Sequence, residues 1–196
     1  MRARMALMVA GQACELREVV LSRKPIELIQ ASAKATVPVL IDTDGRVIDE
    51  SLDIMLWALH RNDPLHWLDP QAGMAETMQW VRRCDGEFKH HLDRYKYQNR
   101  FDISDRGDPR NLAAKFLEDL NQRLEAFPCL AGPDWGFADT AVAPFVRQFA
   151  HTDRAWFASQ PWPRLQFWLE EFENADLFKR IMTVQPPWQS GPMFHT

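Results

Sequence analysis

The chain has 196 residues, 46% of them hydrophobic and 26% charged, which is typical of a folded protein with one large or two small domains. The formal net charge of −4 argues against a nucleic-acid partner, because a phosphate-binding surface normally shows as an excess of Lys and Arg. No stretch approaches the ~20 apolar residues that span a bilayer, so no membrane partner is expected.

The first elements alternate between helix and strand. Residues 1–10 contain no helix breaker and end at Gly11, which suits the position after a helix, so they predict a short helix. Residues 14–21 alternate apolar and charged side chains and predict a strand. Pro25 fits the first turn of a short helix over 26–31.

A hairpin and a helix are predicted next. Residues 36–41 form a β-branched run whose proline must sit at the start or edge of a strand. Asp44 and Gly45 are a strong turn signal, and 46–48 would be the returning strand. Residues 50–60 carry apolar side chains at helical spacing and predict a helix.

The second part of the chain has a purely helical pattern. Start signals and apolar periodicity predict five helices, at about residues 70–100, 109–127, from 137 onward, 162–173 and 176–184. The proline-rich tail from residue 185 is expected to be irregular. We therefore expect an α+β domain over 1–64, a linker within 61–70 and an all-α domain over 70–196.

The cysteines and histidines indicate neither disulfides nor a metal site. Cys14, Cys84 and Cys129 are odd in number and form no C-x-x-C motif. His90 and His91 are adjacent on a predicted helix and point about 100° apart, so they cannot chelate one ion together. We expect no metal, and three free thiols fit a cytoplasmic protein.

Three segments in order carry a family resemblance. The sequence TVPVL at 36–40, the Asp44-Gly45 turn and the sequence IDESLDI at 48–54 resemble the glutathione-binding half of a glutathione transferase. Residues 1–7 and 21–25 resemble the omega class, which is of the cysteine type.

The resemblance continues into the second part of the chain. Phe137-Ala138-Asp139 is similar to the buried helix-start motif of the family's second domain. The resemblance therefore implies a thioredoxin-like α+β N-terminal domain followed by an all-α C-terminal glutathione-transferase domain, and a homodimer.

The resemblance also implies a glutathione site. A cis Val37–Pro38 peptide would present the backbone of Val37 to the extended ligand. Ser51 would offer its hydroxyl, its N–H and a helix N-terminus to a carboxylate, Glu50 would take the ligand's ammonium, and Lys24 would reach the glycine carboxylate. Taken singly, Ser51 is as well explained as a helix cap, Glu50 as a surface acid and Lys24 as a solvated lysine.

A second substrate, hydrophobic or a disulfide, is expected beside the helix that contains Tyr95, Tyr97 and Phe101. These aromatic residues alternate with basic ones, a pattern that a solvated helix face also explains.

The catalytic group that the resemblance implies is not found in the chain. Cysteine-type transferases carry a first strand and a C-P-[YF]-A motif directly before the helix that here begins at residue 1. We therefore expect a domain that lacks its first strand, with no catalytic role for Cys14, Cys84 or Cys129. The implied activity is thiol transfer or glutathione-dependent reduction in a full-length form. The alternative is a non-catalytic glutathione-binding or scaffold protein of the same fold.

Overall fold

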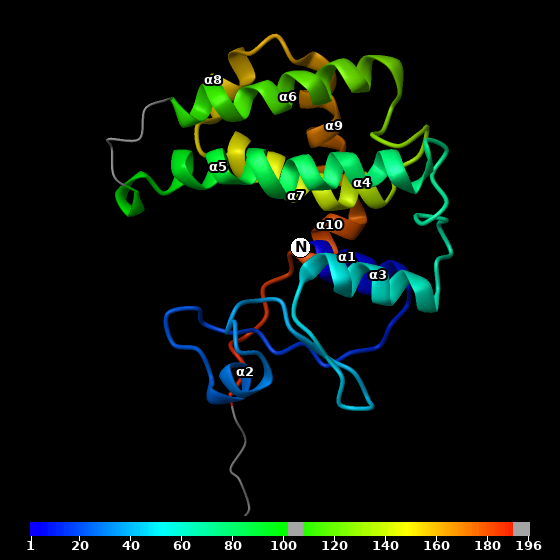
Figure 1. Cartoon of the computed structure of the whole chain (residues 1–196), viewed down its shortest axis with the longest axis vertical. Coiled ribbons are helices and arrows are strands. Elements are labelled where there is room, and N and C mark those ends of the chain that lie inside the picture. The colour runs from blue at the N-terminus through cyan, green and yellow to red at the C-terminus, as the bar shows by residue number, and fades with distance from the viewer. Residues whose placement is uncertain (102–107, 190–196) are drawn as a thin grey trace, which may run out of the picture. The chain divides into compact units, whose positions relative to one another are not determined.

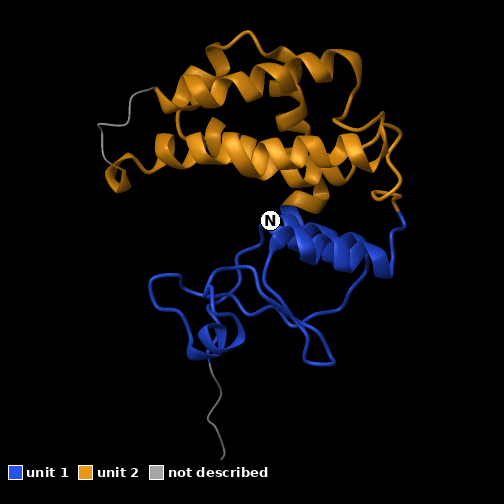
Figure 2. Ribbon diagram, viewed as in Figure 1, with its two compact units in different colours: residues 1–64, 179–196 blue, residues 65–178 orange. Residues whose placement is uncertain are grey.

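The computed structural model describes residues 1–101 and 108–189, which fall into two compact units (Figures 1 and 2). Unit 1 consists of Met1–Pro64 together with Lys179–Thr196, and unit 2 is Leu65–Phe178. Unit 1 contains a small sheet and helices, whereas every regular element described in unit 2 is a helix. The predicted fold class, an α+β part followed by an all-α part, is confirmed.

Unit 1 contains a two-stranded sheet and three helices before residue 65. In chain order they are α1 (Arg2–Val9), α2 (Ile26–Ala31), β1 (Leu40–Ile41), β2 (Val47–Ile48) and α3 (Ser51–Arg61). The strands are antiparallel, with Leu40 opposite Ile48 and Ile41 opposite Val47. Gly45 has φ +85°, which a glycine adopts without steric cost, and it turns the chain between the strands.

The core of unit 1 lies where α1 and α3 pack along one another and against the hairpin. Ala3, Ile48 and Ile54 form one buried cluster, so α1, β2 and α3 each contribute a side chain to it. Met5 of α1 and Met55 of α3 are also buried. Each fully buried Ile or Met side chain contributes about 1.5–3 kcal/mol to stability.

The prediction of a strand over 14–21 is wrong. In the part of the chain that the structure describes, this segment takes part in one isolated parallel bridge, between Glu18 and Pro187. Alternating side chains make a strand only when the backbone also has a ladder partner, and one bridge does not form a ladder.

The helices of unit 2 follow the predicted positions with two differences. They are α4 (Gly73–Arg83), the π-helical turn η1 (Cys84–Phe88), α5 (Lys89–Lys96), the 3-10 turn η2 (Gln98–Arg100), α6 (Pro109–Ala126), α7 (Phe137–Ala150), α8 (Arg154–Ser159) and α9 (Pro163–Asn174), with α10 (Asp176–Ile181) crossing into unit 1.

The predicted helix over 70–100 is therefore two α-helices joined by a π-helical turn. α8 was not predicted, because six residues are too few to show an apolar periodicity. None of the described helices is long and apolar enough to cross a membrane.

Asp139, on the first turn of α7, organises the interior of unit 2. Its carboxylate accepts hydrogen bonds from the backbone N–H of Leu130 at 2.9 Å, the backbone N–H of Gly136 at 3.2 Å and the indole N–H of Trp168 at 2.9 Å. Burial nevertheless raises the pKa of Asp139 to about 6. One side chain thus ties the 130 loop, the start of α7 and α9 together.

Candidate functional site

The Val37–Pro38 peptide bond is cis, as the resemblance implied. The Val37 side chain is 46% exposed. Within the residues that the structure describes, the backbone N–H and C=O of Val37 have no backbone partner. Both groups are therefore available to an extended peptide ligand.

The hairpin register brings the two halves of the predicted site to the same end of the sheet. Leu40 pairs with Ile48 in an antiparallel register. In such a register, a residue before Leu40 lies opposite the residue the same number of positions after Ile48. Extending this register by two residues sets Pro38 at the level of Glu50. The register therefore puts the segment before β1 and the segment after β2 at the same end of the sheet.

Glu50 and Ser51 form the start of α3. Glu50 is the N-cap residue, and its carbonyl accepts the N–H of Ile54 at 3.0 Å. Ser51 is the first helical residue, and the first-turn N–H groups of a helix have no partner within the helix. Together with the helix dipole they favour a carboxylate at this point.

Lys34, which the sequence analysis did not single out, contacts the candidate residue Glu50. Its Nζ lies 2.5 Å from Oε1 of Glu50 and 3.3 Å from Oδ1 of Asp49. The hydrogen bond to Glu50 is the main reason that the pKa of Lys34 is raised. The only signal in the sequence was a lysine three residues before Val37.

Asp49 completes this polar cluster. Its Oδ2 accepts a hydrogen bond from Oγ of buried Ser32 at 2.8 Å, which is the main cause of the lowered pKa of Asp49. The segment before β1 is therefore fastened to the segment after β2 through Ser32, Lys34, Asp49 and Glu50.

Lys24 stands apart from this cluster. It is exposed in the segment that precedes α2. The structure records no contact of Lys24 with any described residue of the cluster, and its role toward the glycine carboxylate stays a prediction.

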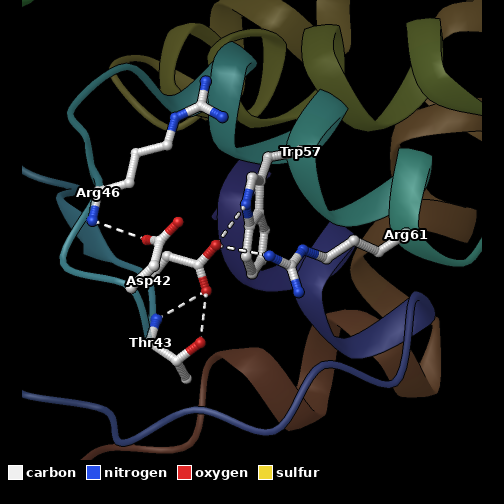
Figure 3. Close-up of polar contacts among 6 residues, drawn as sticks. Asp42, Thr43, Arg46, Trp57 and Arg61 are labelled. Atoms are coloured by element: carbon white, nitrogen blue, oxygen red, sulfur yellow. Dashed lines mark hydrogen bonds and ion pairs between the residues drawn. The ribbon is translucent and has the colours of Figure 1, made fainter.

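A second polar cluster fixes the hairpin to α3 (Figure 3). The Asp42 side chain is 7% exposed and accepts the backbone N–H of Thr43 at 2.7 Å, the indole N–H of Trp57 at 3.2 Å and an N–H of Arg61 at 2.6 Å. The guanidinium of Arg61 also lies over the Trp57 ring, 4.2 Å from its centroid. The Thr43 N–H, with help from Arg61 and Trp57, lowers the pKa of Asp42.

This cluster forms part of the wall of a cavity of about 620 Å³ between the hairpin and the exposed face of α3. Arg46, Asp53 and His60 also line the cavity. Val37, Glu50 and Ser51 do not line it, whereas Asp49, the neighbour of Glu50 that contacts Lys34, does. The Asp42 cluster in its wall joins the hairpin to α3 through the hydrogen bonds from Trp57 and Arg61.

The three aromatic candidates for a second-substrate pocket contact different neighbours. Tyr95 packs on Phe149 with ring centroids 5.1 Å apart. Tyr97 is covered by Arg100, 4.5 Å from its ring centroid, and Phe101 by Arg94, 4.9 Å from its ring centroid. The three rings thus pack against different neighbours, and a common pocket for a second substrate stays a prediction.

The described cysteines differ in exposure. Cys14 is exposed, whereas Cys84 and Cys129 are buried. Burial is the main cause that raises the pKa of Cys129 to about 12. At neutral pH the Cys129 thiol is therefore protonated and is a poor nucleophile.

The comparisons with known proteins concern both parts of the chain. Residues 1–66 match the family model for the N-terminal domain of glutathione S-transferases. No curated protein sequence matches the chain significantly. Among solved structures, a glutathione transferase from Pseudomonas putida superposes with a TM-score of 0.80 at 19% identity, covering 94% of this chain and 86% of that one.

A glutathione transferase from Burkholderia graminis gives a TM-score of 0.75 at 22% identity, covering 91% of this chain and 81% of that one. A third, from Methylococcus capsulatus, gives 0.74 at 23% identity, covering 91% and 90%. The fold is that of the glutathione transferases. It consists of a small thioredoxin-like α+β part and a helical part, and the similarity extends over nearly the whole chain.

Proposed function

We propose that this chain is a glutathione-binding protein of the glutathione transferase superfamily, of omega-like type. The observation that supports this most directly is the alignment of the cis Val37–Pro38 peptide with Glu50 and Ser51 at one end of the hairpin. The Pseudomonas putida relative was crystallised with one glutathione disulfide per subunit and the Burkholderia graminis relative with two glutathione molecules per subunit. Both facts support glutathione as the ligand.

Each part of glutathione has a partner in this proposal. The N–H and C=O of Val37 pair with the ligand's backbone as a strand would. The ligand's γ-glutamyl carboxylate binds the hydroxyl and N–H of Ser51, where the dipole of α3 adds to the attraction. Its ammonium binds Glu50, which exchanges part of its contact with Lys34, and Lys24 takes the glycine carboxylate.

The binding proposal is tested by titrating glutathione into the purified chain in a calorimeter. We expect saturable binding that weakens about tenfold or more in Glu50→Gln and about three- to tenfold in Ser51→Ala, because each variant removes a polar contact worth about 1 kcal/mol or more. Glu170→Gln, which changes an exposed carboxylate of unit 2, is the matched control and should bind as the unaltered protein does. Equal affinity in all variants would exclude this site.

The chemistry that the resemblance implies is thiol transfer or glutathione-dependent reduction. Both need a thiolate that exchanges with a disulfide. We assign that role to none of Cys14, Cys84 and Cys129; the burial of Cys84 and Cys129 supports this for those two thiols. The second candidate function is binding without covalent chemistry. Turnover of a mixed glutathione disulfide by the chain separates the two functions.

We further propose a cytoplasmic homodimer whose second substrate, hydrophobic or a disulfide, binds beside Tyr95, Tyr97 and Phe101. Three free cysteines fit a reducing compartment. Light scattering during gel filtration tests the dimer. Protection of Tyr97 and Phe101 from hydrogen exchange by a hydrophobic glutathione conjugate, but not by glutathione alone, tests the second-substrate position.

A further inference from the structure

The C-terminal segment 185–189 contacts the segment 14–21 in unit 1. Pro187 forms a parallel bridge with Glu18, and the backbone N–H of Trp188 donates to the carbonyl of Glu18 at 2.7 Å. Figure 1 shows the red segment after α10 running through the irregular part of this unit. Segments about 170 positions apart in the sequence are thus joined by backbone pairing.

The side chain of Trp188 adds a cation–π contact to this backbone pairing. The guanidinium of Arg17 lies over the Trp188 ring, 4.8 Å from its centroid. Two N–H groups of Arg17 also donate to the Glu15 carboxylate, at 3.1 and 2.9 Å, which keeps the guanidinium in place. These hydrogen bonds, together with a smaller one from the Trp188 side chain, lower the pKa of Glu15.

The sequence of the segment explains why one residue anchors it. Pro186 and Pro187 have no N–H, so Trp188 supplies the first backbone donor after them. A Pro-Pro pair also holds the chain extended before binding, which lowers the entropy lost on docking. The neighbouring Val184 is 91% exposed, so its side chain takes no part in the contact.

We propose that residues 15–18 form a docking site for an extended Pro-Trp peptide, and that the chain's own segment 185–189 occupies this site as a releasable strap. Glu18 pairs with the backbone of the segment, and Arg17 covers its indole. Because the strap is part of the same chain, its effective concentration is of the order of millimolar, and a free peptide has to displace it.

The test uses the full chain and a fluorescent peptide with the sequence of residues 184–189. In Trp188→Ala the strap loses its anchor, so we expect the peptide to bind this variant saturably and the unaltered chain at least tenfold more weakly. A peptide with Trp188 replaced by Ala should not bind. In the Trp188→Ala background, Arg17→Ala should weaken binding about 3- to 30-fold, whereas Arg23→Ala, an exposed arginine nearby, should leave it unchanged.

Three results would overturn the proposal: no binding to the Trp188→Ala variant, equal binding to both chains, or equal effects of Arg17→Ala and Arg23→Ala. If Trp188→Ala does not fold, hydrogen exchange on the unaltered chain decides. We expect the Trp188 amide to exchange at least tenfold more slowly than the Val184 amide, and excess peptide to remove this protection. Equal exchange of the two amides would contradict the docking.

Discussion

The Nζ of Lys34 lies 2.5 Å from the carboxylate of Glu50, the residue that we propose receives the ammonium of glutathione. Both side chains are about half exposed. Water screens an exposed ion pair of this kind strongly, so a ligand can compete with it at little cost. The pair therefore holds the Glu50 carboxylate in place at the proposed site without preventing a ligand from binding there.

This competition predicts opposite effects for two nearby lysines. Lys34→Gln frees Glu50 for the ligand's ammonium, and we expect glutathione to bind up to about fivefold more tightly, the largest effect that an exposed pair allows. Lys24→Gln removes the proposed partner of the glycine carboxylate and should weaken binding about threefold or more. Calorimetry at low ionic strength measures both, with Lys115→Gln in unit 2 as the control. Equal shifts in the two variants would point to net charge as their cause.

The contact between Trp57 and Asp42 gives a prediction on stability. Trp57→Phe keeps a ring beneath Arg61 but removes the indole N–H that donates to Asp42 at 3.2 Å. We expect the free energy of unfolding in urea to fall by about 1 kcal/mol.

The matched control is Trp80→Phe, because the Trp80 ring packs edge-on against Phe116 in unit 2. Trp80→Phe should leave the hydrogen exchange of the hairpin amides unchanged, whereas Trp57→Phe should accelerate it. Identical exchange in the two variants would show that the Asp42 cluster does not hold the hairpin.

The sequence predicted the elements whose signals are local. The glycine after α1, the proline before α2 and the turn at Asp44-Gly45 each act within a few residues, and the structure has a helix end, a helix start and a turn at these positions. The predicted helix start at residue 109 is likewise confirmed, and the preceding Asp108 caps α6 by accepting the N–H groups of Arg110 and Asn111.

Interactions between distant segments were not predictable. The alternation over 14–21 indicates a strand, but whether a ladder forms depends on a partner that no local pattern reveals. The contact of Lys34 with Glu50 likewise spans 16 positions. For the candidate site, the resemblance supplied Val37, Glu50 and Ser51, whereas the hairpin register, which puts their two segments at one end of the sheet, came from the structure.

The exposure of the cysteines predicts their reactivity. In the native chain, a thiol reagent such as an aromatic disulfide should modify one cysteine, Cys14, because Cys84 and Cys129 are buried. After unfolding, all three should react. Mass spectrometry of the labelled peptides identifies the modified residue, and Cys14→Ser should abolish the native reaction. Rapid native labelling of Cys129 would contradict its raised pKa.

The buried Asp139 predicts an unusual dependence of stability on pH. Its pKa is raised from an ordinary value of 3.8 to about 6, so the folded state binds a proton more tightly than the unfolded state does. The contribution of Asp139 to stability is therefore fully present below about pH 4, falls as the pH rises toward 6, and is constant above that, by about 3 kcal/mol in total. Carboxylates with lowered pKa values, such as Asp42 and Asp49, have the opposite effect at lower pH.

Comparing the free energy of unfolding of Asp139→Asn with that of the unaltered chain isolates the contribution of Asp139. Asp139→Asn does not titrate and sets an amide N–H against the N–H of Gly136, so we expect it to be less stable at the acid end, by about 1–3 kcal/mol. The stability advantage of the unaltered chain should shrink as the pH rises from 4.5 to 6.5 in urea unfolding. An advantage of the unaltered chain that grows with pH would contradict this prediction. Only a carboxylate whose pKa is lowered by folding stabilises the folded state more as the pH rises. The N–H donors of Leu130, Gly136 and Trp168 would then outweigh the effect of burial and hold the Asp139 carboxylate ionised.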